Sequence, residues 1–138
     1  MSETIRIGNC SGFYGDRLAA AKEMIDGGPI DVLTGDYLAE LTMSILYNQM
    51  QSRGKNLGYV GTFLKQVKDV AQDCKEKNIK IVTNAGGLNP KSMAIEIENI
   101  LQELKIKMKV AWIDGDDIKD DIEQLQKEGE SFINMDRG

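Results

Sequence analysis

The chain contains no histidine, and only two cysteines and two prolines occur among its 138 residues. Without histidine it lacks the commonest general base near neutral pH, so acid–base chemistry must use carboxylates, lysine, tyrosine or cysteine. Cys10 and Cys74 are far apart in the sequence, which excludes the usual zinc spacings. We expect free thiols, with Cys74 buried as a small apolar residue, and no structural metal.

Long apolar runs and basic patches are also missing. No run approaches the ~20 apolar residues of a membrane span, and no basic and then apolar leader opens the chain. The formal net charge of −5 argues against a general affinity for nucleic acid. The sequence therefore predicts a cytoplasmic protein with neither a membrane nor a nucleic acid as its partner.

Short β-branched runs alternate with segments of helical periodicity along the chain. Strands are expected at 5–9, 30–33, 80–83 and 108–113, and helices at 17–25, 38–50, 63–77, 90–104 and 118–128. Strands separated by helices run parallel. We therefore expect one α/β domain over residues 1–138, with a three-layer open parallel sheet of about four strands and helices on both faces, as in Rossmann-like and flavodoxin-like folds.

Polar residues and glycines gather where the expected strands end. In an open parallel sheet, ligands bind at the carboxyl ends of the strands, and backbone N–H groups of glycine turns can hold an anion. The predicted ligand-binding residues are Asn9, Ser11, Gly12, Gly15, Thr83, Asn84, Gly86, Gly87 and Asn89. Asp36 is the predicted acid or base, with Asp116 as a second catalytic candidate.

Each of these residues also has a purely structural interpretation. The glycines suit tight turns, and Asp16, Asp36 and Asn89 suit helix N-caps. The spacing of the first glycine loop does not match a dinucleotide or Walker motif. Asp114, Asp116 and Asp117 could bind Mg²⁺, but acidic residues at a helix start also complement the helix dipole without a metal.

Four blocks of sequence carry a family resemblance. They are Gly8-Asn9-Cys10-Ser11-Gly12-Phe13-Tyr14-Gly15-Asp16-Arg17, the segment from Gly28 to Glu40, the segment from Thr83 to Pro90, and Gly115-Asp116-Asp117. In this order the blocks resemble the core of the acyclic terpene utilisation (AtuA-like) family. The family's members are several times longer, and their block similar to Phe132-Ile133-Asn134-Met135-Asp136 lies well inside them, so the chain resembles their N-terminal portion.

The resemblance implies a role in the breakdown of branched acyclic terpenoids and other acyl compounds, with a CoA thioester as the substrate carrier. The expected protein is an enzyme of unknown reaction, or its substrate-binding component, which binds an acyl-CoA or another anionic ligand. One alternative is a non-catalytic assembly module or truncated subunit that docks on a partner or on another copy through open sheet edges and its C-terminus. A further alternative is a nucleotide-binding oxidoreductase domain, which Asp36 and the first glycine loop favour.

Overall fold

The computed structural model describes residues 4–134 and 136 and contains a small parallel sheet. Its strands are β1 (Ile7–Asn9), β2 (Val32–Gly35) and β3 (Lys80–Thr83), which lie side by side in that order. Both neighbouring pairs are parallel, and Gly8, Leu33 and Ile81 stand in register across the sheet. The open parallel α/β sheet predicted from the sequence is therefore confirmed.

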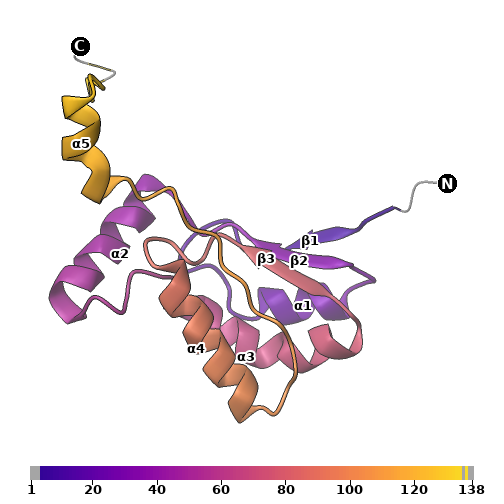
Figure 1. The fold of residues 1–138 in the computed structure, drawn as a ribbon. Helices are drawn as coiled ribbons and strands as arrows, with labels where there is room; N and C mark the ends of the chain where they lie inside the picture. Colours follow the sequence, from indigo (N-terminus) through magenta and orange to yellow (C-terminus); the bar gives the residue numbers. More distant parts are fainter. Residues whose placement is uncertain (1–3, 135, 137–138) are drawn as a thin grey trace.

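Five α-helices and one 3₁₀ turn complete the described part of the chain. In sequence order these elements are α1 (Ala20–Asp26), α2 (Glu40–Arg53), α3 (Gly61–Glu76), α4 (Pro90–Glu103), the 3₁₀ turn η1 (Lys119–Asp121) and α5 (Ile122–Lys127). Figure 1 shows α1, α3 and α4 on one side of the sheet, with α2 beyond the carboxyl ends of the strands.

Two groups of buried side chains form the core. One joins α1 and α3 to the inner face of the sheet through Ile25, Leu33 and Val70. The other lies at the carboxyl ends of the strands, where Tyr37 and Phe63 meet edge to face and Leu46 of α2 is fully buried. Cys74 is buried in the first group, as expected.

The structure differs from the expectation of helices on both faces, because the other face of the sheet has no helix layer in the described residues. Ile7 and Val82 point to this outer face and are 66% and 60% exposed. The physical reason is the strand order. Right-handed crossovers that step in one direction, from β1 to β2 to β3, place every connecting helix on the same face.

The expected strand at 108–113 is not formed, because these residues pair with none of the described strands. Its alternating pattern is visible in the burial, because Ile106, Met108 and Val110 are half-buried while the intervening lysines are exposed. Met108 packs against the α1–α3 core group. Beyond this segment, η1 and α5 stand apart from the sheet and the other helices (Figure 1). Met135, in the last family-like block, lies outside the described residues.

Candidate functional site

The carboxyl ends of β2 and β3 are joined by one side chain, Asn84. Its amide nitrogen donates to Oδ1 of Asp36 over 2.7 Å, and its Oδ1 accepts from the backbone N–H of Tyr37 over 2.8 Å. Both bonds span strand ends that are far apart in the sequence, and together they define the orientation of the amide. Asp36 and Asn84 are exposed, so this pair is a polar feature that a ligand can reach.

Neighbouring bonds hold the three strand ends in place. Thr83 donates its hydroxyl to the carbonyl of Gly35 over 2.9 Å and accepts from the N–H of Ala85. At β1, the carbonyl of Ser11 accepts from the N–H of Asp36 over 3.0 Å. The predicted residues that follow the three strands are therefore brought to one edge of the sheet.

Asp36 does not cap α2. That helix begins at Glu40, its N-cap residue is Ala39, and no side chain caps it. The carboxylate turns instead toward Asn84 and, more weakly, toward the N–H of Leu38 at 3.4 Å. The structural interpretation of Asp36 as a helix cap is wrong, which leaves its carboxylate at the strand ends.

The first glycine loop holds a carboxylate of its own chain. Asp16 accepts from the N–H of Gly12 over 3.0 Å and from the N–H of Arg17 over 2.7 Å. These two bonds hold the pKa of Asp16 below its ordinary value. Asp16 is therefore not the cap of α1, which begins at Ala20. Gly15, at the positive φ of 100°, makes the turn of this loop.

The second glycine turn is packed tightly against the protein. A Cβ on Gly87 would lie 2.4 Å from Cδ1 of Leu46 and 2.8 Å from the carbonyl oxygen of Gly58, and a Cβ on Gly86 would meet Pro90. The N–H of Gly87 donates to the carbonyl of Asn84, and the N–H of Leu88 donates to that of Gly58. Packing thus accounts for both glycines, and an anion-binding role for them stays a prediction.

Asn89 caps α4, as expected, by accepting from the N–H of Ser92 over 3.1 Å. Its side-chain nitrogen also donates to the carbonyls of Lys55 and Leu57. The same residue therefore fixes the start of α4 and the loop after α2.

A buried polar group that the sequence reasoning missed lies beneath the strand ends. The hydroxyl of Tyr37 donates to Oε1 of Gln66 over 2.5 Å, and Gln66 donates onward to the carbonyl of Arg17. Cys10 is buried beside them, and desolvation raises the pKa of both Tyr37 and Cys10. Gln66 interrupts the apolar stripe of α3, and this polar residue is the sequence feature that could have indicated the buried polar group.

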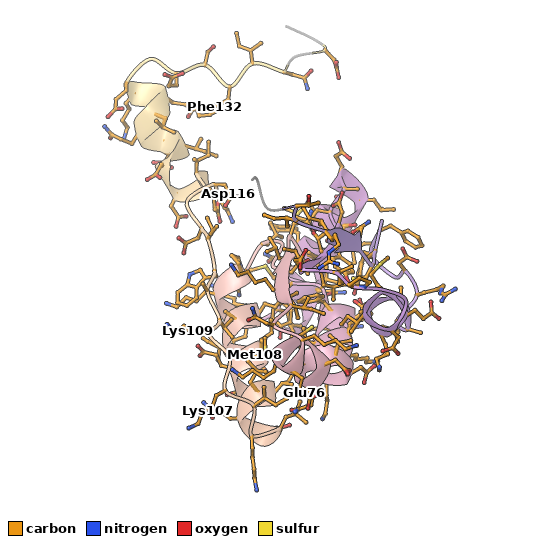
Figure 2. The ribbon with its side chains drawn as sticks, turned by 90° about the vertical axis from the view of Figure 1, so that its right-hand side faces the viewer. Glu76, Lys107, Met108, Lys109, Asp116 and Phe132 are labelled. Carbon is orange, nitrogen blue, oxygen red and sulfur yellow. The ribbon has the colours of Figure 1, made fainter. Side chains whose placement is uncertain are left out.

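Asp116 lies elsewhere, on the exposed segment that leads to α5, where Figure 2 labels it. Within residues 4–134, no hydrogen bond or ion pair joins it to Asp36. In the same residues, no three histidine, cysteine, aspartate or glutamate side chains gather in a way that could hold a metal ion. No helix of the described chain is long and apolar enough to cross a membrane.

An open groove of about 590 Å³ adjoins the first strand end. Three of the predicted ligand residues, Asn9, Ser11 and Gly12, line it, together with the flank of α1 and the loop before β2. The Asp36–Asn84 pair and this groove are thus features of the strand-end region that a small molecule could contact.

Comparison with known proteins gives a family match. No curated protein and no solved structure matches the chain. Residues 5–138 match the family described as acyclic terpene utilisation family protein AtuA. Because the match covers nearly the whole sequence, the chain belongs to the AtuA family of acyclic terpene utilisation proteins.

Proposed function

We propose that the chain is the substrate-binding part of an enzyme that acts on branched acyl compounds during acyclic terpene utilisation. The exposed Asp36–Asn84 pair at the carboxyl ends of β2 and β3 carries the proposal. Among the described residues, only Asp36 accepts from the side-chain nitrogen of Asn84, which leaves the second amide hydrogen for a ligand oxygen. A carboxylate beside that hydrogen can accept a proton from the bound molecule.

The proposal concerns the acyl end of the substrate more than its phosphates. The N–H groups of Gly12 and Gly87 donate to acceptors within the protein, and Asp16 and Asp36 add negative charge. An uncharged thioester carbonyl suits this environment, and Asn84 can donate to it. The CoA carrier is proposed from the family alone, and its phosphates would extend away from the strand ends.

Calorimetry with branched acyl-CoA thioesters and with free CoA tests the proposal on the full chain. We expect the thioesters to bind, Asn84→Ala to weaken binding about tenfold through one lost hydrogen bond to the ligand, and Asp36→Asn to abolish complementation in a host that lacks its own copy. Asp69→Asn, an exposed change on α3 without a hydrogen-bond partner among the described residues, is the matched control. If no thioester binds the wild-type chain, the proposal is overturned.

The outer face of the sheet favours a second candidate function, a non-catalytic module that assembles with a second copy of itself. Ile5, Ile7 and Val82 are exposed, and Lys80 is the single charged residue in the three strands. A nearly uncharged face can meet its own copy without opposing like charges. Light scattering measures the oligomeric state of the chain and tests this candidate. A dimer that is dissociated by Val82→Lys would support it, and a monomer at all concentrations would contradict it.

A further inference from the structure

We propose that the groove between α1 and the first strand binds an aliphatic chain that ends in an uncharged polar group. This inference rests on the proposed function in one respect, since the chain would be the acyl portion of the same substrate. The groove volume of about 590 Å³ falls within the ~300–1,000 Å³ that is usual for small-molecule sites.

The apolar wall of the groove comes from Met24 on α1 and from Pro29 and Ile30 before β2. Met24 and Ile30 lie directly over Gly8 of β1. A Cβ at Gly8 would be 2.6 Å from Cγ of Met24 and 3.2 Å from Cδ1 of Ile30. Glycine at this position thus lets the two side chains form the wall, and methionine is flexible enough to adapt to a branched chain.

The polar residues of the groove select an uncharged head group. Asn9 and Ser11 line the end nearest the strand ends, and the acidic residues Asp16 and Glu23 are part of the groove lining as well. The carboxylate of Asp16 is ionised at neutral pH, as is usual for aspartate, and hydrogen bonds from the N–H groups of Gly12 and Arg17 lower its pKa further. No lysine or arginine is among the described residues of the lining, and because Glu23 is paired with Arg17, Asp16 is the lining residue whose carboxylate has no ion-pair partner among the described residues. A carboxylate or phosphate would therefore be repelled.

Two glycines leave open space along the groove. A Cβ at Gly12 or at Gly28 would have no atom within 4 Å, and neither residue has a positive φ. Gly28 is part of the groove lining, so we expect a larger side chain there to fill part of the space that the ligand would take. Gly61, at the start of α3, has the same freedom and lies outside the groove, so it provides a matched control.

The test is an amide NMR titration of the full chain with 1-octanol and, separately, with sodium octanoate at neutral pH. We expect octanol to shift the amides of Gly12, Met24 and Gly28, and octanoate to bind about tenfold more weakly because of the carboxylate of Asp16. Gly28→Leu should weaken octanol binding about tenfold or more by filling the groove. Gly61→Leu should leave it unchanged, and circular dichroism verifies that both variants fold.

Three outcomes would overturn the proposal. They are shifts confined to the outer sheet face around Ile7 and Val82, equal binding of octanol and octanoate, and wild-type octanol binding by Gly28→Leu. These results are separate from those of acyl-CoA calorimetry. If octanol binds and no thioester binds, the proposed ligand site in the groove is supported and the proposed function is contradicted. If a thioester binds equally well to the wild type and to Gly28→Leu, the proposed function is supported and the proposed ligand site is contradicted.

Discussion

At the scale of single residues, Asn84 matters most to the strand ends. It donates to Asp36 and accepts from the N–H of Tyr37. Its position directly after an expected strand marked it as a site candidate from the sequence alone. Its partners could not be predicted, because they follow β2, almost fifty positions earlier, and only the strand order brings the two ends together.

Two substitutions of Asn84 test its two side-chain hydrogen bonds separately. Asn84→Ala leaves the N–H of Tyr37 without its partner and should cost about 1–2 kcal/mol of unfolding free energy. Asn84→Asp keeps an acceptor for that N–H but places a second carboxylate next to Asp36. The variant should therefore have a lower unfolding free energy than the wild type at neutral pH, and this difference should shrink as acid protonates one of the two carboxylates. Urea unfolding at several pH values measures both effects.

Asn99→Asp on the exposed face of α4 introduces the same charge without an acidic hydrogen-bond partner and is the control for this pair of variants. If Asn84→Asp were as stable as Asn99→Asp at neutral pH, the Asp36–Asn84 bond would be absent in solution.

Asp16 should make the stability of the protein sensitive to acid. Its pKa in the folded chain lies below the ordinary value of 3.8 because Gly12 and Arg17 donate backbone N–H groups to it. A carboxyl group whose pKa is lower in the folded chain than in the unfolded chain stabilises the fold at pH values above its unfolded pKa. This stabilisation is lost as the pH falls through the pKa of the folded chain. Asp16→Asn should therefore melt below the wild type at neutral pH, and the two should converge below about pH 3.

Thermal unfolding followed by circular dichroism across this range measures the difference. A constant difference at every pH would mean that the carboxylate of Asp16 is not held by the loop. The wild-type curve should still fall in acid, because Arg6 lowers the pKa of Asp31 in the same way.

At the scale of elements, the second glycine turn shows how close packing between elements can require glycine. The sequence predicted the strand at Lys80–Thr83, the cap at Asn89 and the start of α4 at Pro90, and all three are confirmed. Gly86 and Gly87 were predicted to present N–H groups to a ligand. The structure shows a different requirement, since Leu46 of α2 and the carbonyl of Gly58 approach Gly87, and Pro90 approaches Gly86, too closely for a side chain. Such an approach depends on tertiary packing, which local sequence does not record.

Gly87→Ala should be strongly destabilising for this reason. The backbone φ of 53° and the contacts with Leu46 and Gly58 both oppose a Cβ, and the expected loss is about 2 kcal/mol or more. Gly61→Ala, whose Cβ meets nothing, should change stability by less than about 0.5 kcal/mol. Denaturant midpoints compare the two, and similar midpoints would contradict the packing described around the second glycine turn.

At the scale of the whole molecule, the order β1-β2-β3 explains what sequence reasoning could not reach. Periodicity identified the helices and the three strands, but it does not reveal whether the strand order reverses. Without a reversal, all crossovers lie on one face. The crevice that forms where strand order reverses is therefore absent from the described strands, and the candidate ligand positions lie at an open edge and in the groove beside α1 instead.

The final helix should be the least stable part of the described chain. It has only six residues and buries none of them, and isolated helices shorter than about 12–15 residues are marginal in water. Amide hydrogen exchange should show α5 exchanging almost without protection, while amides in the buried part of α3 remain protected. Equal protection in both helices would mean that α5 packs against another surface in solution.

The outer face of the sheet has a consequence for how the protein can be handled. Ile5, Ile7 and Val82 present apolar surface to water, and sulfate salts strengthen the tendency of such surface to be removed from water. Despite its net charge of −5, the protein should be retained by a phenyl resin at moderate ammonium sulfate concentrations, and it should be salted out earlier than proteins of similar charge whose sheets are covered on both sides.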